Sequence, residues 1–250
     1  MIATMRSEWI KLRTVRMNDV LVILAVAFPL IISVLTVSLQ KTNDIDALGL
    51  VGLITGTSVI TALLLGVVGA VSIAGEFSHG TIRVTFAATP NRKRVLLAKG
   101  IVTVATSMIV EAIVVLMCYG ICTTIADSRG VTVSLDDAPG ATPAIVGVVV
   151  FAGLVSLLGF GLGMLIRNTA AAVTALILWP LLLENLLAGL LFAVGVRPPT
   201  RWLPFTSGVL MADPTTIDRD VGRVAGGVYF GVVTLAITLV GAFLTTRRDA

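Results

Sequence analysis

The chain has 250 residues, of which 56% are hydrophobic and only 13% are charged, with a formal net charge of +4 at pH 7. Its mean hydropathy of +1.02 lies outside the range of soluble globular domains. The composition therefore excludes a soluble globular protein and predicts an integral membrane protein.

Six apolar segments predict transmembrane helices. Each meets or exceeds the about 20 residues that a helix needs to cross a hydrocarbon core of about 30 Å. The segments are continuously apolar, whereas barrel strands alternate apolar and polar residues over about 10 positions. We therefore expect one all-α membrane domain over residues 1–250, with spans at 20–39, 48–74, 100–126, 144–166, 169–196 and 224–246.

Residues 1–18 predict a helix that lies on the membrane surface. An apolar stripe recurs at helical spacing, and basic residues lie off it; the stripe comprises Ile2, Met5, Trp9 and Leu12. Such a helix binds the membrane interface. The alternative is a basic leader that only sets topology.

The first span is longer than the apolar core of a signal peptide. We therefore expect that it is not cleaved off and remains part of the protein.

Hydroxyl side chains gather on one half of the second span, namely Thr55, Thr57, Ser58 and Thr61. They predict either part of a polar path through the membrane or hydrogen bonds between helices.

Residues 76–99 form a polar stretch between two apolar runs. Glu76 ends the first run, and Gly80 and Pro90 provide signals that stop one helix and start another parallel to the membrane. The basic residues that follow suit a phospholipid surface or an acidic rim on a partner; they are Arg92, Lys93 and Arg94. The alternative is a solvated loop that only fixes topology.

Two acidic residues lie inside predicted spans, Glu111 in the third and Glu184 in the fifth. A charge near the centre of a membrane helix costs roughly 3 kcal/mol, so such residues are functional candidates. Glu184 follows Trp179-Pro180, where the helix is expected to kink, and precedes Asn185. We expect these polar residues to belong to a gate or substrate path, with hydrogen bonding to a neighbouring helix as the structural alternative.

Other candidate motifs do not indicate catalysis. Cys118 and Cys122 lie one helical turn apart in an apolar helix, which predicts small residues at a helix interface rather than a metal site or a disulfide. Gly159, Gly161 and Gly163 lie within a span and predict close helix packing. No G-x-x-x-x-G-K-S/T phosphate loop is present. We therefore expect no catalytic, metal or cofactor site on this chain.

Residues 197–223 are too apolar for a simple outer loop and contain four prolines. They predict short re-entrant or interfacial helices before the last span. Trp202 and Phe205 are expected at the boundary between lipid and water, where aromatic residues are common.

The Lys and Arg residues indicate the orientation of the chain. Twelve lie on the side that carries both termini and residues 76–99, against six on the other side. The positive-inside rule therefore places both termini and this loop in the cytoplasm of a multi-pass cell-membrane protein. The orientation of the chain and its contact with membrane lipid account for the basic residues. We therefore expect no nucleic-acid partner.

The whole chain resembles the permease subunits of ATP-binding cassette transporters of the type-two exporter family. The resemblance is carried by the Trp-bearing basic N-terminal helix, the six spans and the cytoplasmic motifs Glu76-x-x-x-Gly80-Thr81-Ile82, Pro90-x-Arg92 and Lys99. It implies short external helices before the last span, and a permease dimer or a pair of related permeases enclosing the translocation path.

The same resemblance implies a coupling helix that docks on a separate nucleotide-binding subunit, which would hold ATP and Mg. The residues expected to form this contact are Glu76, Phe77, His79, Gly80, Thr81, Ile82 and Arg83. We expect Glu76→Ala or Arg83→Ala to leave folding intact and to lower transport-coupled ATP hydrolysis.

The leading prediction is thus an export permease for an amphiphilic or hydrophobic solute, driven by a partner ATPase. The alternative is a secondary transporter that uses Glu111 or Glu184 as a proton carrier. An intramembrane enzyme ranks third, because no Ser or Asp pair is placed with a basic partner inside the spans.

Overall fold

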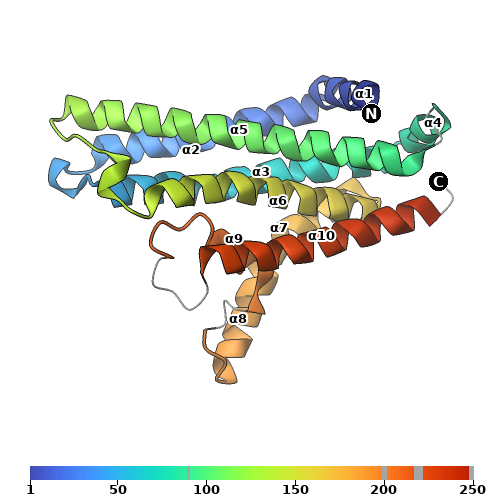
Figure 1. The fold of residues 1–250 in the computed structure, drawn as a ribbon. Coiled ribbons are helices and arrows are strands. Elements are labelled where there is room, and N and C mark those ends of the chain that lie inside the picture. The colour runs from blue at the N-terminus through green and yellow to red at the C-terminus, as the bar shows by residue number, and fades with distance from the viewer. Residues whose placement is uncertain (89–90, 199–201, 217–221, 248–250) are drawn as a thin grey trace.

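The computed structural model describes residues 1–88, 91–198, 202–216 and 222–247 (Figure 1). Secondary structure in these ranges is entirely helical. Six helical segments are long and apolar enough to cross a membrane: α2 (Arg16–Leu39), α3 (Ala47–Ser78), α5 (Arg92–Ser128), α6 (Ala141–Ile166), the combined α7 and α8 (Thr169–Ala193) and α10 (Arg223–Arg247). The predicted all-α membrane fold is confirmed.

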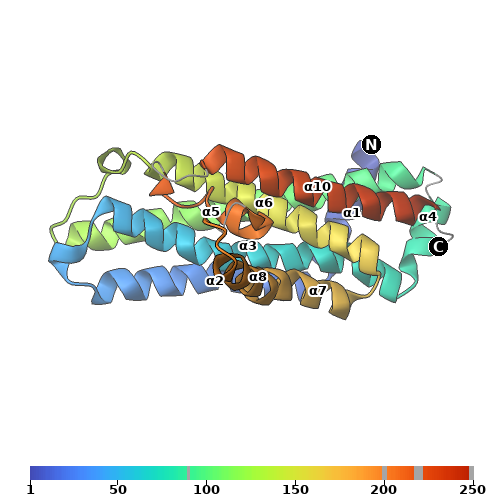
Figure 2. The same cartoon turned by 90° about the horizontal axis from the view of Figure 1, so that it is seen from below.

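The long helices lie side by side with α6 at the centre of the bundle (Figures 1 and 2). α6 contacts α3, α5, α7 and α10, while α2 packs against α3 and α5. The N-terminal helix α1 (Ile2–Thr14) and the last turn of α10 lie at the same end (Figure 1). We call this the basic end, because it carries the exposed residues Arg6, Arg13, Arg16, Arg83, Lys93, Arg94 and Arg247.

Glycines let α6 approach its neighbours closely. A Cβ atom added at Gly159 would lie 2.0 Å from the Gly66 carbonyl oxygen of α3, and one at Gly163 would lie 2.6 Å from the Ile73 side chain. Gly161 instead faces Thr238 of α10. The predicted packing role of these glycines is confirmed, because a larger side chain would separate the helices.

At the basic end the helices extend beyond the apolar runs that define the predicted spans. α3 continues through Glu76 to Ser78, and α5 begins at Arg92 after an Asn91 cap whose side chain accepts a hydrogen bond from the Arg94 N–H at 3.0 Å. Hydropathy marks only the lipid-compatible part of each helix, so it could not predict these turns. The predicted stretch 76–99 therefore lies partly inside α3 and α5.

The connection between these helices has the predicted break and short helix. Gly80 has a φ of 69°, a left-handed conformation that commonly follows the end of a helix. The short helix α4 (Thr81–Ala88) follows directly. Pro90 lies outside the described residues.

The fifth span is interrupted where the sequence predicts a kink. α7 (Thr169–Leu178) leads into a π-helical turn at Trp179–Leu183, and then into α8 (Glu184–Ala193). Pro180 has no backbone N–H to maintain the regular hydrogen-bond pattern. Beyond this turn, α8 points away from the bundle (Figure 1) and is seen end-on in Figure 2.

The outer segment contains the short helix α9 (Pro204–Val209), which packs against α10 and α6. Phe205 is buried, and its ring lies 5.2 Å from that of Phe151 and 5.7 Å from that of Phe230. The prediction that Phe205 lies at the lipid–water boundary is therefore wrong, because an aromatic cluster inside the bundle buries it. Trp202 is exposed, with 64% of its surface accessible.

We expect Gly159→Ala to destabilise the protein, because the new methyl group would collide with the Gly66 carbonyl of α3. Overpacking of this kind costs typically about 1–3 kcal/mol. Gly120→Ala is the matched control, since a Cβ at Gly120 of α5 meets no atom within 4 Å. Thermal unfolding in detergent should show a lower midpoint for Gly159→Ala alone. Equal midpoints for the two variants would contradict the close α3–α6 contact.

Candidate functional site

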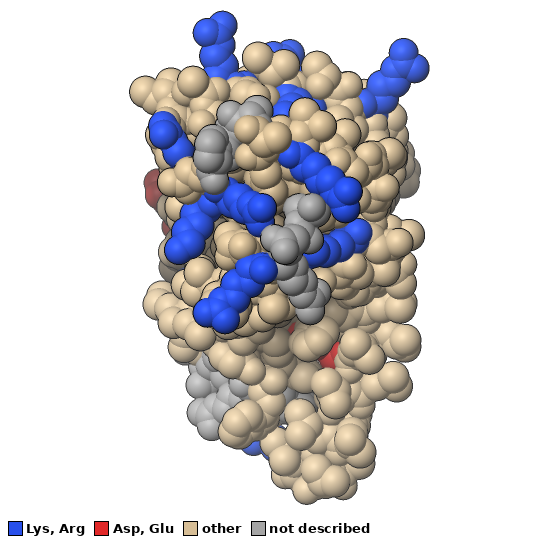
Figure 3. Space-filling model, turned by 90° about the vertical axis from the view of Figure 1, so that its right-hand side faces the viewer, with Lys and Arg blue, Asp and Glu red and all other residues tan. Residues whose placement is uncertain are grey.

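The candidate site lies at the basic end, where α1, α4 and the adjoining turns of α3 and α5 meet (Figure 1). Viewed from this end, Lys and Arg side chains gather over the surface (Figure 3). Beneath this surface lies a cluster of four paired charges, which we call the ion cluster: Glu8, Lys11, Glu76 and Lys99.

The ion cluster joins three helices. Lys99 Nζ of α5 lies 2.9 Å from Glu76 Oε1 of α3 and also pairs with Glu8 Oε2 of α1. Lys11 Nζ lies 3.0 Å from Glu8 Oε1 and 3.2 Å from Glu76 Oε1. Glu8 and Lys99 are each only 4% exposed. Each buried charge therefore has opposite charges beside it, and the two acids balance the two lysines.

Lys11 extends the ion cluster to α4, because its ammonium also donates a hydrogen bond to Thr85 Oγ1 at 3.2 Å. Partial burial lowers the pKa of Lys11, but the hydrogen bond to Glu8 and the negative charge of Glu76 outweigh this effect. The pKa of Lys11 consequently lies above its ordinary value, so its ammonium group stays protonated at physiological pH.

The local sequence of α1 places its charges inward. Glu8, Lys11 and Leu12 are three and four residues apart and share one helix face. Leu12 is buried, whereas Ile2 is 85% exposed and Trp9 is 41% exposed. The predicted apolar stripe is thus divided: Leu12 packs inward beside charges, while Ile2 and Trp9 face outward.

α4 has one buried and one exposed side. Ile82 and Phe86 pack into an apolar cluster with residues of α3, α5 and α6. Thr81, Arg83 and Val84 face outward, and Val84 is 71% exposed. The outward residues, together with the preceding turn, form what we call the outer face of α4: His79, Gly80, Thr81, Arg83, Val84 and Ala87.

The seven predicted coupling residues therefore occupy different places. Glu76 belongs to the ion cluster, Ile82 is buried, and the half-buried Phe77 lies 4.9 Å from the Arg167 guanidinium. Four others lie on the outer face of α4, namely His79, Gly80, Thr81 and Arg83. His79 Nδ1 also donates a hydrogen bond to the Gly75 carbonyl at 2.8 Å, at the end of α3.

Glu184 is buried and accepts four hydrogen bonds. Its Oε1 accepts from Trp179 Nε1 at 2.8 Å and from the Phe205 N–H at 2.7 Å. Its Oε2 accepts from the Thr206 N–H and from Thr206 Oγ1, both at 2.7 Å. The carboxyl group thus satisfies the first N–H groups of α9 and links this helix to the turn before α8.

Glu111 has a different environment. It is completely buried, Ser58 of α3 lies beside its carboxyl group, and neither carboxyl oxygen has a partner within standard hydrogen-bond geometry. The Ser58 and Ser33 hydroxyl oxygens are likewise buried without a hydrogen-bond partner. Glu111 therefore lacks the set of four donors that surrounds Glu184, and Ser58 is the hydroxyl group beside it.

The other residues predicted to line a path make hydrogen bonds with backbone carbonyls. Thr61 Oγ1 donates to the Ala25 carbonyl of α2 at 3.1 Å, and Thr57 Oγ1 donates within α3 to the Ile54 carbonyl at 2.9 Å. Asn185 Nδ2 donates to the Leu181 carbonyl at 2.9 Å and is exposed. The structure does not bring Asn185, Thr57 and Thr61 together in one hydrogen-bonded group.

Comparison with known proteins assigns no family: no protein-family model matches the chain, and no curated protein matches it. Within the described ranges, no group of three or more His, Cys, Asp or Glu side chains is placed to hold a metal ion. The features of this chain that bear on function are the ion cluster, the outer face of α4 and the buried carboxyl groups.

We expect Lys99→Met and Glu8→Gln each to destabilise the protein. Removing one partner of a buried ion pair typically costs about 3–5 kcal/mol, because the other charge remains in a poorly solvated place. The double variant removes one charge of each sign and leaves Lys11 paired with Glu76. The double variant should lose less free energy of unfolding than the two single variants lose together, as measured by unfolding in detergent. Simple additivity would show that Glu8 and Lys99 do not interact.

Proposed function

We propose that the chain is the membrane-spanning permease subunit of an ATP-binding cassette exporter. In this proposal a separate nucleotide-binding subunit docks on the outer face of α4 and drives the export of an amphiphilic or hydrophobic solute. The main support is the arrangement around α4, which exposes Arg83 and Val84 on one side and contacts the spans on the other.

α4 contacts the spans in two ways, so a force on α4 can be transmitted to the spans through either contact. Ile82 and Phe86 pack against residues of α3, α5 and α6. The hydrogen bond from Lys11 to Thr85 connects α4 to the ion cluster, which holds α3 and α5 together. α3 and α5 continue through the bundle as spans, so displacement of α4 can change their packing without any covalent chemistry on this chain.

We also propose that the basic end faces the cytoplasm of the cell membrane and that two permease copies, or two related permeases, assemble. The gathering of Lys and Arg at this end supports the orientation (Figure 3). The combined α7 and α8 segment supports the assembly, since only 11% of its most apolar window is buried within one chain. Leu182, Leu186 and Leu190 are among its exposed residues.

A proton-coupled transporter remains the second candidate, and the two acids do not support it equally. Glu184 already accepts four hydrogen bonds, two of them from backbone N–H groups, and a proton would displace at least one of these donors. Glu111 has no such commitment. A proton carrier in this chain would therefore be Glu111.

We expect Arg83→Glu to lower ATP hydrolysis by the permease–ATPase complex several-fold while leaving the unfolding temperature unchanged, because Arg83 is exposed and lies outside the ion cluster. ATP hydrolysis should be measured on complexes purified in mild detergent. Lys41→Glu, an exposed charge reversal at the opposite end, is the control and should retain full activity. Normal hydrolysis in Arg83→Glu would contradict docking on the outer face of α4.

The structure changes the expectation for Glu76→Ala. Glu76 pairs with both Lys11 and Lys99, so this variant should lose stability as well as activity. It therefore cannot separate coupling from folding, and Arg83 is the more informative position.

Glu111→Gln distinguishes the two candidate functions. The amide preserves the size of the side chain but cannot carry a proton. We expect ATP hydrolysis by the Glu111→Gln complex to stay within about twofold of the wild type and its ATP-dependent transport to persist. Transport that requires a proton gradient instead of ATP, and that Glu111→Gln abolishes, would favour the secondary transporter.

A further inference from the structure

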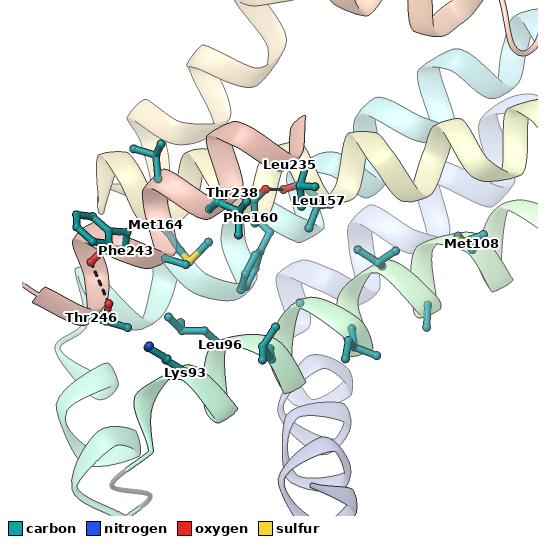
Figure 4. A pocket seen from close by; sticks show the side chains of 18 residues that line it. Lys93, Leu96, Met108, Leu157, Phe160, Met164, Leu235, Thr238, Phe243 and Thr246 are labelled. Atoms are coloured by element: carbon teal, nitrogen blue, oxygen red, sulfur yellow. Dashed lines mark hydrogen bonds between the residues drawn. The ribbon is translucent and has the colours of Figure 1, made fainter. Parts of the chain in front are cut away.

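A long groove lies between α5 and α10, with α6 as its floor (Figure 4). Its cavity volume is about 910 Å³. The walls include Leu96 and Met108 of α5 and Phe243 of α10, while Leu157 and Phe160 contribute from α6. α5 and α10 flank the groove without packing closely along their length.

The groove offers an apolar surface along most of its length. Its two threonines donate their hydroxyl hydrogens to backbone carbonyls: Thr238 Oγ1 lies 3.2 Å from the Leu157 carbonyl oxygen, and Thr246 Oγ1 lies 2.9 Å from the Phe243 carbonyl oxygen (Figure 4). Thr238 Oγ1 also lies 2.9 Å from the Thr234 carbonyl oxygen. Apart from these threonines and Lys93, the side chains that line the groove are aliphatic, aromatic or thioether groups. This part of the groove therefore suits a hydrocarbon chain.

Lys93 is the charged residue that lines the groove, and it lies at the basic end in the first turn of α5. It is exposed and has no ion-pair partner among the described residues. The first turn of α5 contains no acidic side chain. The groove thus combines an apolar channel with one unpaired positive charge at its mouth.

We propose that this groove binds an anionic phospholipid, with an acyl chain along α5 and α10 and the headgroup phosphate at Lys93. From Lys93 to Met108, α5 rises about 22 Å, compared with about 15 Å for the hydrocarbon of one leaflet. An acyl chain that starts at the headgroup level therefore fits within the length of the groove. This inference is independent of the proposed export function.

The volume favours an acyl chain over a helix from another protein chain. A helix of this length and about 10 Å across would occupy about 1,700 Å³, roughly twice the cavity. A helix from a second copy of the chain could therefore cover the groove but could not lie wholly within it. A lipid also brings the phosphate that complements Lys93.

The test is native mass spectrometry of the full chain, purified in detergent and supplied with equal amounts of phosphatidylglycerol and phosphatidylcholine. Phosphatidylglycerol should be retained in clear excess by the wild type. Attraction of anionic lipid by one surface lysine corresponds to about a fivefold preference. Lys93→Ala should lose about that factor while still binding both lipids.

Two further variants make the result specific. Arg94→Ala removes the same charge from the same helical turn, but Arg94 does not line the groove, so the preference should remain. Ala105→Phe places a ring inside the groove at an exposed position and should reduce the retention of both lipids. Equal losses in Lys93→Ala and Arg94→Ala would show diffuse attraction to the basic end and overturn the proposal. Undiminished lipid retention by Ala105→Phe would also overturn it.

Discussion

The ion cluster is the constraint on which the basic end of the molecule depends. Two lysines and two glutamates are paired at the point where α1, α3 and α5 meet, and Glu8 and Lys99 among them are almost completely withdrawn from water. Charges in such a place are tolerated only when they are paired, so the three helices must stay in register. Thr85 attaches α4 to the same group. The cluster therefore couples a surface helix to two membrane spans, which a solvated basic loop could not do.

The two acids within the spans show how similar sequence signals can correspond to different physical situations. Glu184 stabilises the fold by accepting hydrogen bonds at the start of α9, which explains its burial without a transport role. Glu111 has no comparable set of donors, although it is equally enclosed. Burial alone therefore did not distinguish a structural carboxyl group from a candidate functional one, and the distinction needed the positions of the surrounding donors.

The sequence predicted the spans, the kink at Pro180 and the turn at Gly80, because each depends on local composition or backbone chemistry. It did not predict the ion cluster, since Glu8, Glu76 and Lys99 are far apart in the chain and hydropathy treats each only as an interruption. Val84 was missed for a related reason: an exposed apolar residue is informative only when the buried side of α4 is known. The helix ends at Ser78 and Arg92 were missed because hydropathy marks only the lipid-compatible part of α3 and α5.

Site-specific photo-crosslinking from Val84 tests the central claim most directly. A photoreactive benzoylphenylalanine replaces Val84 in the full chain in its native membrane, and adducts are identified by mass spectrometry. Our account predicts an adduct with a nucleotide-binding ATPase subunit, and none when the same residue replaces Lys41 at the opposite end. Adducts from Val84 that contain only lipid, or the absence of an ATPase adduct, would contradict the account.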